Sequence, residues 1–202
     1  VLVQLAVDNN ESVRFKVAKN PNTPPDTLAK LAGDKYGNIR KIFAENPITP
    51  PDTLTEFATD KSRIVRRALA SNYATPPDCY AQLASDKDEE VRGDVAENSN
   101  TPPSILAQLA NDKKAWVRAC VAANTNTPPN ILAKLATDKN EWVQSGVARN
   151  PSTPPDVLGQ LATSGGERER KGVAKNPNTP PDVFAQLAVD NEAVQGSVAE
   201  NP

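Results

Sequence analysis

Residues 153–162 read Thr-Pro-Pro-Asp-Val-Leu-Gly-Gln-Leu-Ala, and variants of this stretch recur along the whole chain of 202 residues. The tripeptide Thr-Pro-Pro occurs seven times, and each copy begins 26 residues after the one before. Its threonines are Thr23, Thr49, Thr75, Thr101, Thr127, Thr153 and Thr179. Self-similarity at a fixed period of this length is the signature of a solenoid, whose repeats stack on their neighbours. We number repeat positions from this threonine as position 1.

The first part of each repeat predicts a short helix. Positions 1 to 4 read Thr-Pro-Pro-Asp in five of the seven copies, which predicts a capping box and a proline in the first helical turn. Apolar residues at positions 6, 9 and 10 then form one stripe, as at Leu132, Leu135 and Ala136. With two prolines and only about ten residues, part of this helix is expected to be 3₁₀.

The second part of each repeat predicts a second helix. Position 12 is aspartate in seven copies and is expected to be the N-cap. Val or Ile follows at position 17, usually Val at 21, and Ala at 22. Asparagine ends eight copies, from Asn20 to Asn201: it occupies position 24 in seven of them and position 23 in the last, which is one residue shorter. Asparagine tolerates the left-handed conformation that ends helices. The predicted fold class is therefore all-α: a solenoid or superhelix of two-helix repeats, with α-helix and some 3₁₀ helix.

The period continues through the chain, so we expect a single repeat domain over residues 1–202. At 26 residues per repeat, 202 residues make about 7.8 repeats. One helix pair cannot bury its apolar stripe alone, but stacked pairs share a continuous core. Neither end carries a polar capping repeat, and we expect the chain to be a fragment of a longer array.

The stretch Asn150–Ala162, together with the pattern Val-Arg-x-x-Val-Ala-x-Asn at Val117–Asn124, resembles the leucine-rich repeat variant family. The resemblance covers the whole chain and concerns the repeat rather than an activity. It implies alternating α and 3₁₀ helices in a right-handed superhelix. A member of that family carries an iron–sulfur cluster in a cysteine-rich segment before its repeats. Nothing in this chain matches that segment, so we carry over no cluster and no ligand.

Composition excludes several kinds of chemistry. The chain has no histidine, which excludes Ser–His catalysis and histidine-based zinc sites. Its two cysteines, Cys79 and Cys120, are 41 residues apart and fit no paired metal spacing. We therefore assign no catalytic residue, no metal, no cofactor and no enzymatic activity. The unpaired cysteines and the lack of a long apolar stretch predict a cytoplasmic protein without membrane contact.

A series of arginines at position 18 has two interpretations. The series consists of Arg14, Arg40, Arg66, Arg92, Arg118 and Arg170, and Gln144 and Gln195 interrupt it. Arginines one layer apart could follow a phosphate backbone, although the net charge of −2 does not favour nucleic-acid binding. Position 18 falls within the packed arc of the helix. We therefore favour pairing with the position-12 aspartate or with backbone carbonyls, and the asparagines at position 24 are likewise interpreted as structural.

Positions 16, 19, 20 and 23 are expected to face away from the core, and they vary most between copies. Both tryptophans of the chain occupy position 16 in adjacent copies, beside small residues. The predicted partner-binding residues are Trp116, Ala119, Cys120, Ala123, Trp142, Ser145, Gly146 and Arg149. Exposed aromatic side chains over a shallow apolar floor are typical of binding hot spots. The structural alternative is that each indole packs over the link between helices.

Two copies depart from the others in charge or in sequence. The copy Thr75–Asn100 carries seven acidic residues and two basic ones, and Glu90, Asp94 and Glu97 share its variable face. This surface is either solvated or able to receive a basic partner. The seventh copy has Ser164–Arg170 in place of the usual link and Glu169 where valine is expected. We expect a frayed helix start or a hinge there, with the earliest hydrogen exchange.

These features favour a monomeric, non-enzymatic scaffold that binds a protein partner. Two alternatives stay open. One is nucleic-acid binding through the arginine series, and the other is an accessory module of an iron–sulfur, redox or enzymatic protein.

Overall fold

The computed structural model describes residues 1–201, which form sixteen α-helices and no β-strand. Contacts divide the chain into two compact units, one spanning Val1–Asn98 and the other beginning at Ser99. In each unit, first and second helices alternate with the period seen in the sequence. The predicted all-α solenoid of two-helix repeats is therefore confirmed.

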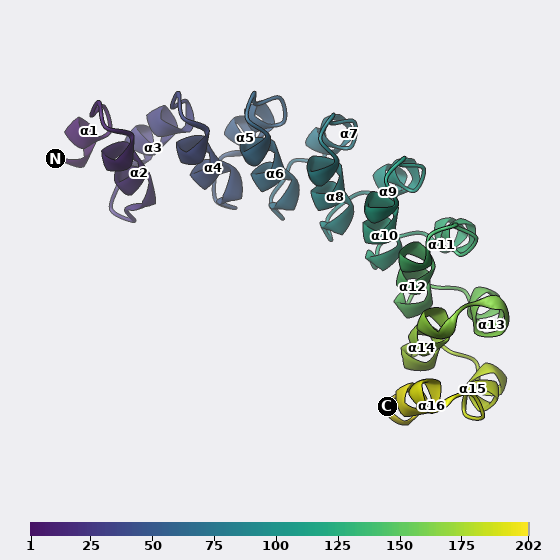
Figure 1. Cartoon of the computed structure of the whole chain (residues 1–202). Coiled ribbons are helices and arrows are strands. Elements are labelled where there is room, and N and C mark those ends of the chain that lie inside the picture. The colour runs from purple at the N-terminus through teal and green to yellow at the C-terminus, as the bar shows by residue number, and fades with distance from the viewer. Residues whose placement is uncertain (202) are drawn as a thin grey trace. The chain divides into compact units, whose positions relative to one another are not determined.

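Within each unit the second helices, which carry even numbers, pack side by side, and the first helices lie along one edge of that row (Figure 1). The helices of the first unit are α1 (Leu2–Leu5), α2 (Glu11–Lys19), α3 (Pro25–Ala32), α4 (Gly37–Glu45), α5 (Pro51–Phe57), α6 (Arg63–Ser71), α7 (Cys79–Leu83) and α8 (Glu89–Glu97). Those of the second unit are α9 (Pro103–Leu109), α10 (Ala115–Ala123), α11 (Pro129–Leu135), α12 (Glu141–Arg149), α13 (Pro155–Ser164), α14 (Glu167–Lys175), α15 (Pro181–Leu187) and α16 (Glu192–Ala199).

The tandem prolines start most of the first helices, but the predicted capping box is wrong. In α13, Pro154 is the N-cap and Pro155 is the first helical residue, which suits a residue that has no N–H to donate. The hydroxyl of Thr153 instead donates a 2.6 Å hydrogen bond back to the carbonyl of Val147 in α12. The threonine therefore closes the end of one helix rather than the start of the next.

The first helices are α-helices along their length, so the expected 3₁₀ content is wrong. In α3 the N–H of Leu28 donates to the carbonyl of Pro24, four residues back, at 3.0 Å. Bonds that span three residues occur at the helix ends, as from Thr27 to Pro24. Such bonds are frequent in the first and last turns of ordinary α-helices.

The aspartate at position 12 opens a turn and is not the predicted N-cap. Before α6, Oδ1 of Asp60 accepts a 2.7 Å hydrogen bond from the N–H of Ser62, and Ser62 is the N-cap. Asp34 and Tyr36 make the same turn before α4. Aspartate side chains commonly accept from the backbone two residues on. The helix consequently begins three residues after the aspartate.

The asparagine at position 24 ends the second helix in an extended conformation, so the predicted left-handed conformation is wrong. Asn150 has φ −71° and ψ 123°, and within residues 1–201 no residue has a positive φ. Its Oδ1 accepts from the N–H of Ser152 at 2.8 Å. Its Nδ2 donates to the carbonyls of Ala122 and Asn124 in the preceding repeat, at 2.7 and 2.9 Å. The structural interpretation is confirmed, because one side chain satisfies three backbone groups and joins two repeats.

The core lies between first and second helices and between neighbouring second helices. The predicted apolar positions are buried, for example Leu135, Val143 and Ala148 in the repeat of α11 and α12. Burying one aliphatic side chain of leucine or valine size stabilises a fold by roughly 1.5–3 kcal/mol. Position 17 departs from this rule in α14, where Glu169 is buried in place of valine. The N-terminus of α14 is not shortened, because Glu167 begins it at the same repeat position as in the other copies; early hydrogen exchange there stays a prediction.

Candidate functional site

The arginines at position 18 are structural, as the sequence favoured. Nε of Arg40 donates to Oδ2 of Asp60 in the next repeat at 2.6 Å, and Nη2 donates to Oδ1 at 2.7 Å. Nη1 donates to the backbone carbonyl of Asp34 in its own repeat. Arg14, Arg66 and Arg118 repeat this arrangement. A bidentate arginine–carboxylate contact of this kind fixes the register of two repeats.

These contacts change the acidity of the aspartates. Burial raises the pKa of the Asp60 carboxyl, but hydrogen bonds from Arg40 and from the N–H of Ser62 lower it by more, so the net pKa lies below its ordinary value. In Asp138 the hydrogen bond from Arg118 is the largest influence, and the pKa is again lowered. Guanidinium groups that are buried in such pairs present no continuous basic surface to a nucleic acid.

At α12 the arginine and the aspartate with which it would pair are both replaced. Gln144 replaces the arginine, and its Nε2 keeps only the hydrogen bond to the carbonyl of Asp138, at 2.6 Å. In the next repeat, Ser164 stands where the other copies have aspartate. The interface between α12 and α14 therefore lacks both members of the ion pair, and neither charge is left buried alone.

Seven of the eight predicted partner-binding residues line one open hollow of about 570 Å³ on α10 and α12. We call it the tryptophan hollow; its lining consists of Ala115, Trp116, Ala119, Ala123, Asn140, Trp142, Ser145, Gly146, Arg149, Asn150 and Pro151. Trp116 and Trp142 are 45% and 58% exposed. Ala119 carries only a methyl group and Gly146 has no side chain, which leaves room beside the indoles. Two exposed indoles that line one hollow form a contiguous apolar surface, and this marks the hollow as the candidate site.

Cys120, the remaining predicted residue, is buried and does not line the hollow. The expected exposure of position 20 is therefore wrong. The reason is close packing on the preceding repeat: a Cβ added to Gly146, at the same position in α12, would lie 2.9 Å from Cβ of Ala122. Ser145 is also largely buried, although it contributes to the lining.

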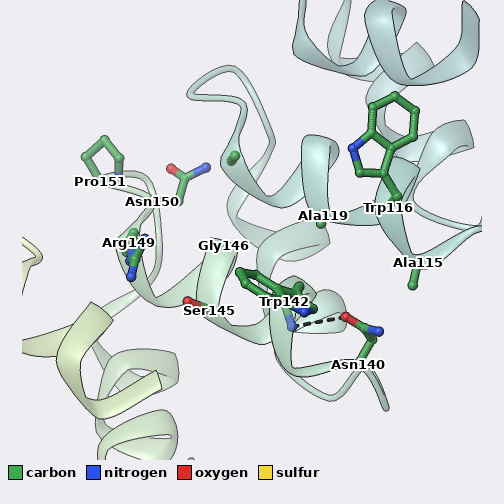
Figure 2. A pocket seen from close by; sticks show the side chains of 11 residues that line it. Ala115, Trp116, Ala119, Asn140, Trp142, Ser145, Gly146, Arg149, Asn150 and Pro151 are labelled. Carbon is green, nitrogen blue, oxygen red and sulfur yellow. Dashed lines mark hydrogen bonds between the residues drawn. The ribbon is translucent and has the colours of Figure 1, made fainter. Parts of the chain in front are cut away.

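Four lining residues were not predicted from the sequence: Ala115, Asn140, Asn150 and Pro151. Asn140 is the N-cap of α12, and its Oδ1 accepts a 3.0 Å hydrogen bond from the N–H of Trp142 (Figure 2). Asn140 could have been found from the sequence, because it lies two residues before the tryptophan at position 16. Asn150 and Pro151 belong to the turn that follows α12, and their repeat positions are shared by most copies, so variability could not have singled them out.

A second, charged hollow of about 450 Å³ lies between α12 and α14. We call it the charged hollow; it is lined by Glu141, Arg149, residues 166–169 and Lys171. Arg149 lines both hollows. The guanidinium carbon of Arg168 lies 3.7 Å from the ring centroid of Trp142, a cation–π contact that connects them.

The acidic side chains of α8 are less open to a basic partner than their sequence indicates. Nε of Arg67 lies 2.7 Å from Oδ2 of Asp94, and Arg63 and Arg67 both contact Glu90. Burial raises the pKa of Asp94 above its ordinary value, although Arg67 opposes this rise. Neighbouring arginines of α6 therefore already engage Glu90 and Asp94.

Within residues 1–201, no helix is both long enough and apolar enough to span a lipid bilayer. In the same residues, no group of three or more His, Cys, Asp or Glu side chains is placed to hold a metal ion.

Comparisons with known proteins agree with this architecture. Residues 12–35 match the model of the family described as leucine rich repeat variant. Among solved structures, the chain is similar to one described as a leucine-rich repeat variant with a novel repetitive protein structural motif. The two are 26% identical, 94% of this chain and 74% of that chain are covered, and the TM-score is 0.67.

Two solved engineered proteins are more distant, with identities of 16% and 15% and TM-scores of 0.45 and 0.33. Both cover 98% of this chain, and they are covered over 76% and 94% of their own lengths. No curated protein sequence matches the chain.

The stacked helix pairs define the class of the protein: it is an all-α repeat solenoid. Within that class, the family match and the structural likeness confirm the resemblance of its repeats to the leucine-rich repeat variant family.

Proposed function

We propose that the chain is a non-enzymatic scaffold that binds a protein partner at the tryptophan hollow. The observation that carries this proposal is the pair of exposed indoles, Trp116 and Trp142, on adjacent helices around one hollow. Binding energy at protein interfaces concentrates in a few aromatic and arginine side chains that fill complementary hollows. Arg149 at the edge of the hollow adds the second kind of residue.

The two alternatives have weaker support. The position-18 arginines engage aspartates and carbonyls, so nucleic-acid binding has no exposed arginine series to rest on. A role as accessory module of a redox or enzymatic protein depends on segments other than the repeats, and no observation on the repeats favours it.

The test is quantitative capture of partners from a lysate of the source cells. The double variant Trp116→Ala, Trp142→Ala is expected to weaken capture about 30-fold or more, because hot-spot truncations remove about 2 kcal/mol or more. The matched control, Tyr36→Ala with Tyr73→Ala, removes two exposed aromatic side chains from the first unit. We expect the control to capture like the parent. Equal capture by the tryptophan variant and the parent contradicts the proposal, provided that both have the same helical content.

A further inference from the structure

Glu169 is a buried carboxylate that the fold leaves without a partner for one of its oxygens. The residue is only 3% exposed, and its Oε1 has no hydrogen-bond partner within residues 1–201. Other repeats place valine or isoleucine at this position, as at Val143 in α12. A buried acceptor without a donor destabilises a fold, more so when the acceptor belongs to an ionisable group.

Gly166 makes room for this carboxylate, because a Cβ added to it would lie 2.8 Å from Oε2 of Glu169. A Cβ added to Gly165 would collide with the backbone carbonyl oxygen of Leu161 in α13. Glu169 is also the third residue of α14, and the first turn of a helix favours an acidic side chain. Gly166 therefore accommodates the carboxylate of Glu169, whereas Gly165 is required by the backbone of α13.

Four of the other five charged side chains of the charged hollow have partners within residues 1–201, and Arg149 is the exception. Glu167 contacts Lys171 at 2.7 Å, and Arg168 approaches Glu141 to 3.9 Å while it stacks on Trp142. Glu169, in contrast, makes no ion pair within residues 1–201. The hollow therefore offers one unsatisfied carboxylate beside an apolar site that shares Arg149 with it.

We infer that the charged hollow receives a basic side chain, lysine or arginine, of the protein that binds the tryptophan hollow. This inference rests on the proposed function, because it names the chemistry of the same partner. The ammonium or guanidinium group supplies the donor that Glu169 lacks, while a neighbouring apolar side chain of the partner lies between Trp116 and Trp142. A charge-assisted hydrogen bond to a desolvated carboxylate is among the stronger polar contacts in proteins.

The experiment uses N-acetyl-arginine methylamide as the probe and its citrulline counterpart, an uncharged isostere, as the control ligand. Amide resonances of Gly165, Gly166 and Gly172 report binding in NMR titrations of the whole chain. We expect saturable shifts with the arginine probe and binding about tenfold weaker in Glu169→Gln, from the usual strength of a hydrogen bond to a charged group. Glu169→Val serves as a second variant that should fold, since valine fills this position in other repeats.

Glu192→Gln is the matched control, because it removes an exposed carboxylate of α16 that lines neither hollow. It should bind the arginine probe like the parent. The inference is overturned if citrulline binds as well as arginine, if both Glu169 variants keep the parental affinity, or if no saturable shift occurs. The probe titration does not depend on the capture assay with the tryptophan variants. Failure of this inference is therefore distinguishable from failure of the proposed function.

Discussion

The interface between α4 and α6 and the interface between α12 and α14 differ at equivalent repeat positions. In the first, Arg40 forms two hydrogen bonds with Asp60, and Val65 fills position 17. In the second, Gln144 and Ser164 replace the ion pair, and Glu169 occupies position 17. The second-helix packing is nevertheless retained in both.

The difference shows how a repeat protein can change one interface without losing its fold. Removing one partner of a buried ion pair is strongly destabilising, whereas removing both is tolerated. The charged hollow lies at the altered interface, and the tryptophan hollow on α10 and α12 shares Arg149 with it. Departures from the repeat consensus therefore coincide with the region where side chains are available to a ligand.

The largest expected effect comes from breaking the regular interface. Arg40→Ala leaves Asp60 buried without its cation and should lower the free energy of unfolding by about 3 kcal/mol. The control, Lys41→Ala, removes an exposed contact with Glu45 and should change the free energy of unfolding by about 0.5 kcal/mol or less. Urea unfolding followed by circular dichroism measures both. Equal effects of the two substitutions would show that the buried pair has no special importance.

A double-mutant cycle can restore the regular pair at the altered interface. Gln144→Arg alone places a cation opposite Ser164 and should destabilise the chain, while adding Ser164→Asp should recover much of the loss. We expect a favourable coupling energy of about 2 kcal/mol, because the two positions contact each other in the other repeats. Additive effects of the two substitutions on the free energy of unfolding would contradict the interpretation that the two positions form a pair.

A smaller gain is expected from Glu169→Val. Replacing an unsatisfied buried carboxylate by the residue usual at this position should raise the free energy of unfolding by about 1 kcal/mol. Glu167→Gln, which removes an exposed contact with Lys171, should leave it nearly unchanged. Thermal unfolding compares the three chains. A loss of stability in Glu169→Val would mean that the carboxylate supports the fold.

The smallest expected effects are those of pH on the contribution of single carboxyl groups to the free energy of unfolding. The pKa of Asp60 is lowered in the folded chain, so the stability it contributes is present above its ordinary value of 3.8 and is lost as pH falls through the folded-state pKa. The pKa of Asp94 is raised, so its contribution has the opposite sign and is lost as pH rises above 3.8. NMR titration of the two carboxyl groups measures both directions. A pKa of Asp60 at or above 3.8 would contradict the ion-pair account.

The regular parts of the fold were predictable because their signals repeat. The period, the apolar positions and the structural use of Arg40 and its equivalents follow from the pattern. The helix caps did not follow, because threonine and aspartate can bond to backbone groups on either side, and local sequence does not say which. Thr153 bonds backward to Val147, and Asp60 forms a turn before the helix.

The candidate site was partly predictable for a similar reason. The tryptophans stood out by residue type and position, whereas the burial of Cys120 depends on contact with the neighbouring repeat. The joint loss of Arg and Asp at Gln144 and Ser164 is visible in the sequence, but only once the pairing between successive repeats is known. The lack of a hydrogen-bond partner for Oε1 of Glu169 depends on the three-dimensional packing and leaves no mark in the sequence.

The most direct test of the tryptophan hollow as the recognition site is site-specific photo-crosslinking. A p-benzoylphenylalanine is placed at Arg149, which lines both hollows, and in a separate chain at Tyr73, an exposed aromatic residue of the first unit. The account predicts that one partner crosslinks from position 149, that it does not crosslink from position 73, and that the crosslink is lost with Trp116→Ala, Trp142→Ala. Crosslinking of that partner only from position 73, or undiminished crosslinking from position 149 in the tryptophan variant, would contradict it.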